Sequence, residues 1–291
     1  MKSGLAYQDG CFVEHGSANL LWTHALHYAT SVFEGVRVYG GTPFLLREHI
    51  RRLYRSCELV GLDFHMPVTE CIDLCREIIV RSRLDDAYLR PLVYNAGPDL
   101  GVHAPANKTR LGLLIWEWPA VFGDNASQRG LALSSDVPWR RPSPESFPVQ
   151  AKASAGYLLG SINRRAAEKA GFDDALVLTH DGMVAEATGA NIFIVREGRV
   201  ATPPATSFLD GLTRRTVIGL LDGVAPLDVV PLTLTDLNQA DEIFLTGTAY
   251  EVMPVSRLDS RTLPCGPLTA GLRDKYLQLT RSASTVQEAI A

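Results

Sequence analysis

The first third of the chain contains two stretches in which hydrophobic residues recur with the period of a helix. In residues 47–60, apolar side chains fall three or four positions apart. These positions are Ile50, Leu53, Cys57 and Val60. The spacing predicts an amphipathic helix, which Gly61 can end. A second helix is predicted over residues 69–82.

Strand patterns surround these helices. Residues 32–39 and 43–46 flank Gly40-Gly41, a pair that is typical of a tight hairpin turn because both glycines can take positive φ. Two further strands are predicted at residues 87–94 and 111–116. Pro91 has no N–H group to donate, so the first of these is predicted to be an edge strand or to carry a bulge.

The rest of the chain alternates strand and helix signals. Strands are predicted at residues 131–137, 175–178 and 191–195, and helices at 157–170 and from about 211 to 221. Periodicity is lost at residues 119–126, which predict an interdomain linker. We therefore expect an α/β and α+β fold with domains at residues 1–118 and 127–291.

Composition narrows the classes of partner. The 291 residues carry 28 basic and 32 acidic side chains, interspersed, for a net charge of −4. Such a balance gives no field that would hold nucleic acid or an anionic membrane. No stretch reaches the roughly 18 apolar residues of a membrane span, and the first residues lack a secretory pattern, which predicts a cytoplasmic protein. Five scattered cysteines argue against a disulfide framework.

Lys152 stands alone among small residues. The segment reads Ala151-Lys152-Ala153-Ser154-Ala155-Gly156-Tyr157 and follows residues 138–150, which contain four prolines. An unprotonated lysine amine can bond covalently to an aldehyde, so the segment indicates a covalent catalyst. The alternative is a solvated loop lysine.

Three later segments carry candidate polar groups. Glu186 lies among small and apolar residues, where a carboxylate needs a positive partner such as a protonated ring nitrogen; otherwise it is an exposed turn residue. Residues 208–216 contain a glycine turn that opens a helix, whose first N–H groups attract phosphate, although Asp210 can instead cap that helix. The turn at Thr248 can present N–H groups and a hydroxyl to an anion.

Together these segments resemble the branched-chain amino acid aminotransferases, a family of fold-type IV (class IV) pyridoxal-phosphate enzymes. The resemblance runs from about residue 22 to residue 267. The matching motifs are residues 23–35, 47–53, 88–91, 151–157, 186–193, 211–214 and 246–249. The resemblance implies a small N-terminal α+β domain and a larger C-terminal β-barrel-like domain surrounded by helices.

The resemblance also implies a cofactor, pyridoxal 5′-phosphate, and a role for each matching residue. Lys152 matches the lysine that bonds to the cofactor aldehyde and later moves a proton. Glu186 matches the carboxylate beside the ring nitrogen, and Tyr157 the tyrosine beside the ring phenolate. The phosphate-binding positions are Arg52, Leu212, Thr213 and Thr248. A plain alternative for Arg52 is a solvated helix face.

Substrate positions follow from the remaining matches. The aromatic side-chain pocket corresponds to Tyr28, Phe33, Tyr88 and Trp118, although single aromatic residues on strands are more often core. Arg90 matches the arginine that receives the distal carboxylate of glutamate or 2-oxoglutarate. The N–H groups of Thr248 and Ala249 match those that hold the α-carboxylate. Tyr28 is expected to reach the site of another subunit, which implies a homodimer or a larger homo-oligomer.

The implied activity is transfer of an amino group between a branched-chain, or other apolar, L-amino acid and 2-oxoglutarate. The alternatives are a D-amino acid or (R)-amine transaminase and an aminodeoxychorismate lyase. His24 and His27 could suggest a metal pair, but the resemblance implies no metal. Asp210 replaces a common proline and Ala155 a common glycine, but neither change removes a reacting group. Val121 replaces a common tyrosine, and residues 101–105 keep only part of the family's interdomain loop, which leaves the substrate width open.

Overall fold

The computed structural model describes residues 4–8, 10–14, 23–97, 99–118, 122–123 and 125–288. Contacts divide the chain into two compact units. The first is Met1–Trp118 with Ala151–Gly156 and Thr280–Ala291, and the second is Pro119–Gln150 with Tyr157–Leu279. Two short later segments thus group with the first unit, whereas the scheme drawn from the sequence keeps each domain contiguous. That scheme stays a prediction.

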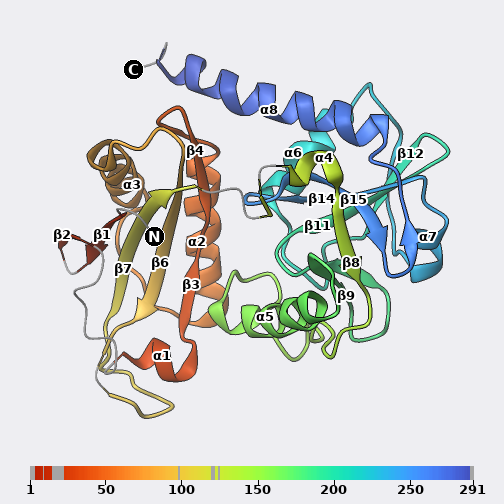
Figure 1. Cartoon of the computed structure of the whole chain (residues 1–291). Helices are drawn as coiled ribbons and strands as arrows, with labels where there is room; N and C mark the ends of the chain where they lie inside the picture. The colour runs from red at the N-terminus through yellow and green to blue at the C-terminus, as the bar shows by residue number, and fades with distance from the viewer. Residues whose placement is uncertain are drawn as a thin grey trace. The chain divides into compact units, whose positions relative to one another are not determined.

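The first unit contains a seven-stranded sheet in the order β2-β1-β7-β6-β4-β5, with β3 also paired to β6. The strands are β1 Gly4–Gln8, β2 Cys11–Glu14, β3 Ser31–Phe33, β4 Val36–Tyr39, β5 Thr42–Pro43, β6 Ala87–Asn95 and β7 Thr109–Glu117. The helices are α1 His24–Tyr28, α2 Leu46–Val60 and α3 Val68–Ser82. Figure 1 shows α2 and α3 against the sheet, where they cover its apolar side.

The two helices expected from periodicity are confirmed to within one residue at each end. In α2, Ile50, Leu53 and Cys57 are buried, as the apolar spacing predicts. Gly61 follows in the left-handed region, with φ of 70°, and its N–H group bonds to carbonyls of the last turn. The hairpin is shorter than expected, because its second strand ends at Pro43 and α2 begins at Leu46.

The prediction that Pro91 marks an edge strand or a bulge is wrong. β6 is central: it pairs with β7 along its whole length and with β3 and β4 on the other side, without a register shift. Proline is tolerated because β3 and β4 are interrupted opposite it. There the N–H group of Glu34 donates to the carbonyl of Pro91 at 2.8 Å, so the pairing on that side continues through the one backbone hydrogen bond that a proline can still make.

The second unit is built on a nine-stranded sheet that closes on itself. The strands are β8 Leu131–Ser134, β9 Asp174–Leu178, β10 Val184–Ala187, β11 Asn191–Arg196, β12 Arg199–Thr202, β13 Leu227–Val229, β14 Glu242–Gly247, β15 Glu251–Leu258 and β16 Arg261–Thr262. Along the path β10-β9-β8-β15-β14-β11, neighbouring strands pair, and β11 pairs back with β10. This closure makes the barrel-like sheet that the resemblance implies.

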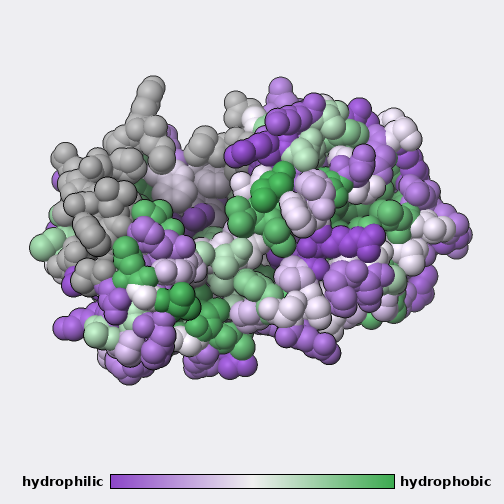
Figure 2. All heavy atoms as spheres, turned by 90° about the horizontal axis from the view of Figure 1, so that it is seen from below, coloured by the Kyte–Doolittle hydropathy of each residue, from purple (hydrophilic) through white to green (hydrophobic). Residues whose placement is uncertain are grey.

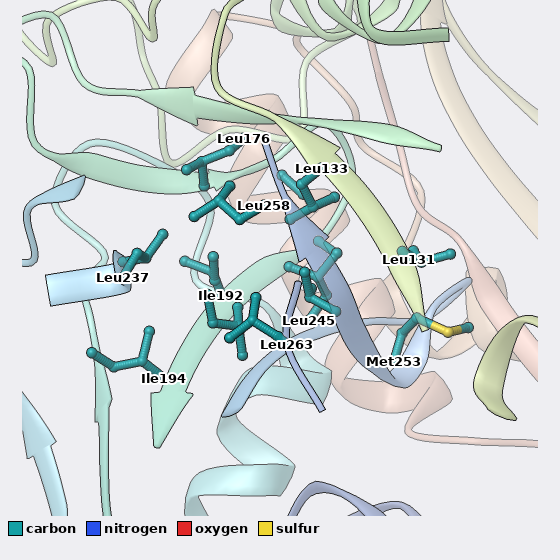
Figure 3. Packing of buried hydrophobic residues seen from close by; sticks show 14 of the residues in the cluster. Leu131, Leu133, Leu176, Ile192, Ile194, Leu237, Leu245, Met253, Leu258 and Leu263 are labelled. Atoms are coloured by element: carbon teal, nitrogen blue, oxygen red, sulfur yellow. The ribbon is translucent and has the colours of Figure 1, made fainter. Parts of the chain in front are cut away.

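Every strand of this ring contributes to one apolar cluster. Leu131 and Leu133 of β8 meet Ile192 and Ile194 of β11 and Leu245 of β14, among others (Figure 3). Successive residues of a strand face opposite sides of its sheet. Residues next to these core positions, such as Asn191 and Thr246, therefore face away from the cluster.

Five helices accompany the barrel strands or follow them. They are α4 Ala126–Arg129, α5 Ser154–Lys169, α6 Leu212–Leu220, α7 Leu234–Asn238 and α8 Pro267–Glu288. α5 begins three residues before the expected start, so Lys152 lies just ahead of a helix. None of the described helices combines the length and the apolar character that crossing a membrane requires.

Candidate active site

The main chain of Lys152 is held within the first unit from two sides. Its carbonyl accepts a hydrogen bond from the N–H group of Phe33 at 3.0 Å, and Val32 and Ala153 form an antiparallel bridge. Its own N–H group donates to Oγ of Ser56 at 3.0 Å. Its Nζ lies 5.3 Å from the centre of the Phe33 ring. Lys152 is therefore a half-buried side chain on a fixed backbone, not the solvated loop lysine of the alternative interpretation.

Arg52 lies against a carboxylate that has no exposed surface. Its Nε and Nη2 donate to Glu34 at 2.6 and 2.9 Å, and Nδ1 of His49 lies 2.7 Å from the same carboxylate. The Arg52 side chain is 13% exposed and that of Glu34 0%. Arg52 is thus oriented by a buried partner, which contradicts the alternative of a solvated helix face.

The charges of this cluster are set by competition between burial and ion pairing. Burial raises the pKa of Glu34, but Arg52 and His49 outweigh it and hold that pKa well below its usual range. Burial lowers the pKa of His49, against the opposing effect of Glu34. The cluster therefore contains an ionised glutamate whose principal partner is the guanidinium of Arg52.

Arg90 lies among aromatic rings of the first unit. Its guanidinium carbon is 4.5 Å from the ring centre of Phe33, 5.5 Å from that of Tyr88 and 5.8 Å from that of Trp116. Tyr88 also stacks on Trp118, with ring centres 4.6 Å apart. In the described part of the chain, Nε of Arg90 is buried and has no hydrogen-bond partner. The site thus combines an apolar wall with a guanidinium whose Nε–H group can still donate a hydrogen bond to a ligand.

A glycine permits this arrangement. A Cβ added at Gly35 would lie 1.7 Å from the hydroxyl oxygen of Tyr88. Any other residue at position 35 would therefore displace the Tyr88 side chain from its position beside Arg90.

Tyr28 lies at the end of α1 and is tied to the loop that follows β6. Its hydroxyl donates to the carbonyl of Leu100 at 2.8 Å, and both ring nitrogens of His24 have partners, at Thr30 and Gly101. Tyr28 is 43% exposed and Leu26 59%. Figure 2 shows apolar residues exposed among polar ones on one face of the molecule.

In the second unit, Glu186 begins a row of polar side chains across the barrel wall. Cross-strand register places Glu186 beside Asn191, and Asn191 beside Thr246. All three are buried, and they face away from the apolar cluster. Glu186 accepts from Asn191 at 3.1 Å and forms an ion pair with Arg141. It is therefore a buried, paired carboxylate and not an exposed turn residue.

The start of α6 lies beside this row. Leu212 and Thr213 form its first turn, where backbone N–H groups lack acceptors within the helix. The N-cap, Gly211, has no side chain, and its own N–H group donates to Oδ1 of Asn191 at 3.1 Å. Asp210 receives hydrogen bonds from Arg214 and Arg215, at 3.0 and 2.8 Å. The helix start is thus an anion-attracting end whose nearest carboxylate pairs with arginines.

The turn after β14 is the third polar feature of the second unit, after the row that begins at Glu186 and the start of α6. The N–H group of Tyr250 bonds to the carbonyl of Gly247 at 3.1 Å, which bends the chain at Thr248 and Ala249. Just before the turn, Oγ1 of Thr246 is buried without a hydrogen-bond partner among the described residues. This hydroxyl therefore has hydrogen-bonding capacity that a bound group can use.

Comparison with known proteins decides the family. The family model described as "Amino-transferase class IV" matches residues 31–258. The chain belongs to the class IV aminotransferases. The branched-chain-amino-acid aminotransferase of Escherichia coli (strain K12) is 35% identical to it over 269 residues, 88% of this chain and 86% of the relative.

Two solved structures show the same fold. The branched-chain amino acid aminotransferase of Escherichia coli aligns with a TM-score of 0.92 and 32% identity over 96% of this chain and 95% of that one. An aminotransferase from Brucella abortus, bound to the cofactor PLP, aligns with a TM-score of 0.87 and 30% identity over 96% and 100%. The expected two-domain class IV fold, with its barrel-like second part, is therefore confirmed.

The residues of this aminotransferase fit a phosphorylated pyridine aldehyde. Glu186 offers a buried carboxylate to a protonated ring nitrogen, and the N-terminus of α6 offers N–H groups to a phosphate. The buried and unpaired Thr246 hydroxyl lies in the same row as Glu186. The donor set thus has one end suited to a cationic ring and another suited to an anion.

The structure separates the expected site residues into two sets. The first unit holds Lys152, Arg52, Tyr28, Phe33, Tyr88, Arg90 and Trp118, and the second holds Tyr157, Glu186, Leu212, Thr213, Thr248 and Ala249. Tyr157 is half-buried on α5, and Ala155 is exposed near the start of the same helix. Val121 lies outside the described residues. The described residues contain no group of three or more His, Cys, Asp or Glu side chains arranged to hold a metal ion, and all five cysteines are free.

Three polar residues of the aminotransferase carried no assigned role in the sequence. Glu34 and Asn191 lie inside matching motifs, and Arg141 lies in the proline-rich stretch before Lys152. A charged residue within the apolar run 32–36 was the available signal for Glu34. Asn191 and Arg141 gave none, because their partners are set by strand register and loop path.

Proposed function

We propose that this aminotransferase transfers an amino group between a branched-chain, or other apolar, L-amino acid and 2-oxoglutarate, with pyridoxal 5′-phosphate as cofactor. The observation that carries the proposal is Arg90 among aromatic rings. Phe33 and Tyr88 offer apolar surface to a branched side chain, whereas Arg90 offers a charged donor to the distal carboxylate of glutamate. One pocket can therefore accept both substrates of the exchange.

Lys152 is proposed as the catalytic base. When bound, the cofactor supplies an aldehyde carbon that bonds to amines and a ring that accepts the electron pair of the broken Cα–H bond. With the cofactor bound, Lys152 Nζ would take the proton from the substrate Cα and would return it to the carbon that carries the amino group after the exchange. Its backbone, fixed by Phe33 and Ser56, limits the directions from which Nζ can reach that proton.

The other residues hold the cofactor. Glu186 would keep a negative charge beside the ring nitrogen, and Tyr157 would donate to the ring oxygen. The proposed phosphate donors would be Arg52, which Glu34 orients, the N–H groups of Leu212 and Thr213, and the Thr248 hydroxyl. The N–H groups of Thr248 and Ala249 receive the substrate α-carboxylate.

The aminotransferase is further proposed to work in the cytoplasm as a homodimer or a larger homo-oligomer. Tyr28, at the exposed end of α1, would contribute to the side-chain pocket of another subunit. Exposed apolar residues on α1, such as Leu26, support an interface there. Sedimentation analysis of the full chain together with a Leu26→Asp variant tests this, because a monomeric wild-type chain would contradict it.

The proposed function is tested by the first half-reaction. Purified holoenzyme is mixed in turn with L-leucine, L-isoleucine, L-valine, L-glutamate, D-alanine and an (R)-amine. Conversion of the bound cofactor to its pyridoxamine form is followed by absorbance. Conversion by the branched L-amino acids and by L-glutamate is expected. Conversion by D-alanine or the amine alone would overturn the substrate assignment, and pyruvate release without a 2-oxo acid acceptor would indicate a lyase.

A further inference from the structure

Asn191 contacts three separate groups of the second unit. Its Nδ2 donates to Oε2 of Glu186 at 3.1 Å and to the carbonyl of Leu209 at 3.0 Å. Its Oδ1 accepts the N–H group of Gly211 at 3.1 Å. One amide side chain thus joins the buried carboxylate to the residues on either side of the turn that begins α6.

The hydrogen-bonding capacity of Asn191 is used fully on its donor side. An amide has two N–H donors, and here each has an acceptor, while the oxygen has a donor. Asn191 is 3% exposed, so water does not compete for these groups. A buried and satisfied amide of this kind fixes the relative positions of its partners.

The fit at α6 is close. A Cβ added at Gly211 would lie 2.2 Å from Oδ1 of Asn191, so only glycine lets the helix start approach the amide. On the other side, Glu186 and Asn191 are the cross-strand pair through which β10 joins β11. The amide therefore connects the closure of the barrel to the first turn of α6.

Arg141 also contacts Glu186, but it serves a different purpose. It reaches the carboxylate from the loop before α5 and supplies a positive charge. The charge does not fix the distance between Glu186 and α6, since no hydrogen bond joins Arg141 to that helix among the described residues. Asn191 contacts both.

We propose that Asn191 is a positioning residue that holds the Glu186 carboxylate and the start of α6 at a fixed separation, so that one cofactor molecule binds by its ring and its phosphate at once. The inference rests on the proposed function, in which these two places receive the two ends of pyridoxal 5′-phosphate. If the two places are held at the right separation, pyridoxal 5′-phosphate binds more tightly than its ring and its phosphate bind as separate molecules, and this gain in affinity can be measured.

The test compares three ligands on the full chain freed of cofactor. Calorimetric titration gives Kd for pyridoxal 5′-phosphate, pyridoxal and inorganic phosphate. The Kd of pyridoxal is multiplied by the Kd of phosphate and divided by the Kd of pyridoxal 5′-phosphate. The result is an effective concentration, which reports how well the ring site and the phosphate site are matched in position. In Asn191→Ala this quantity is expected to fall by about tenfold or more, as for coupled groups in direct contact.

A matched control separates positioning from general stability. Glu242 is also buried and also ties a strand of this sheet to a helix start, accepting from the N–H group and hydroxyl of Thr269 at 2.8 and 2.6 Å. Glu242→Gln is expected to lower stability yet leave the effective concentration within about twofold. Glu242 begins β14, whereas Thr246, the neighbour of Asn191, lies near the end of that strand.

A second variant keeps the test decisive if Asn191→Ala does not fold. Asn191→Leu keeps approximately the size of the side chain but has no polar atom, so it bonds to none of Glu186, Leu209 and Gly211. It is expected to show the same fall. An unchanged effective concentration in either folded variant would overturn the inference. If the unaltered chain bound no pyridoxal 5′-phosphate, the proposed function would fail, and this inference with it.

Discussion

Arg52 donates two hydrogen bonds, at 2.6 and 2.9 Å, to a Glu34 carboxylate that has no exposed surface. Replacing Glu34 by Gln removes the buried negative charge that pairs with the largely buried guanidinium of Arg52. We expect the free energy of unfolding to fall by about 3–5 kcal/mol, the usual cost of breaking a buried ion pair. Urea unfolding of the full chain measures this.

The matched control is the Arg55–Glu58 pair on the same helix, whose side chains are 65% and 66% exposed. Glu58→Gln is expected to change stability by less than about 1 kcal/mol, because water screens an exposed pair. Equal losses in the two variants would contradict the assignment of Glu34 as a buried anchor of Arg52.

The same carboxylate predicts a pH dependence. Because the pKa of Glu34 is lowered in the folded chain, the unfolded chain binds more protons in the acid range. The stabilisation by Glu34 is therefore complete above its unfolded pKa, about 4.3, and is lost as pH falls toward the folded value. The stability difference between wild type and Glu34→Gln should shrink between about pH 6 and pH 3; a constant difference would contradict this.

Lys152→Ala tests the catalytic base. Removing the amine is expected to lower the rate of amino transfer by about 10³-fold or more, since the amine is the proposed base for the proton at Cα. Binding of pyridoxal 5′-phosphate through its phosphate should persist, with a weaker Kd. A variant that retained the wild-type turnover rate would remove Lys152 from the mechanism.

Arg90→Gln is expected to separate the two substrates. Loss of a charged donor should lower kcat/KM for L-glutamate by about 10–100-fold, whereas kcat/KM for L-leucine should change by less than about threefold. Arg81→Gln is the control, because Arg81 also lies over an aromatic ring, that of Phe12, at 4.4 Å. Equal effects of Arg90→Gln on both amino acids would refute the dual use of the pocket.

Tyr250 and Asp174 form a buried pair beneath the turn that contains Thr248. The Tyr250 hydroxyl donates to Asp174 at 2.7 Å, and Thr188 donates to the same carboxylate. Burial raises the pKa of Asp174, although these hydrogen bonds oppose the shift. Tyr250→Phe should lower the free energy of unfolding by about 1–3 kcal/mol, since a buried carboxylate loses a donor.

The control for this prediction is Tyr54→Phe, which removes a hydrogen bond to the neutral carbonyl of Met66. Its expected cost is about 0.5–1.5 kcal/mol. Thermal unfolding of both variants at neutral pH gives the comparison, and a larger loss in Tyr54→Phe would argue against the Asp174 interaction.

The helices with a clear apolar period and the segments with recognisable motifs could be predicted from the sequence. α2 and α3 repeat apolar residues over four turns, so their limits follow closely from the pattern. α1 and α7 have five residues each, too few for a period to show. Pro91 misled because its acceptance depends on an interruption in neighbouring strands that are distant in sequence.

Some residues of the candidate site could likewise be predicted from the sequence, and others could not. Lys152 and Glu186 stand in recognisable segments, so their positions could be selected without coordinates. The part played by Asn191 depends on register between β10 and β11 and on a helix start 20 residues later. Local sequence does not specify such contacts, because many registers satisfy the same alternation of apolar and polar residues.

The anchoring of Lys152 has a consequence for synthesis of the chain. Ser56 Oγ and the Lys152 N–H group are 96 residues apart in sequence, yet they complete the same compact unit. A ribosome adds about 5–20 residues per second, so α2 emerges roughly 5–20 seconds before its partner segment exists. During that interval β3 lacks the single antiparallel bridge that Ala153 later makes to Val32. A strand edge that stays unpaired for that interval can form non-native pairs, so this segment is exposed to misfolding until Ala153 has been added.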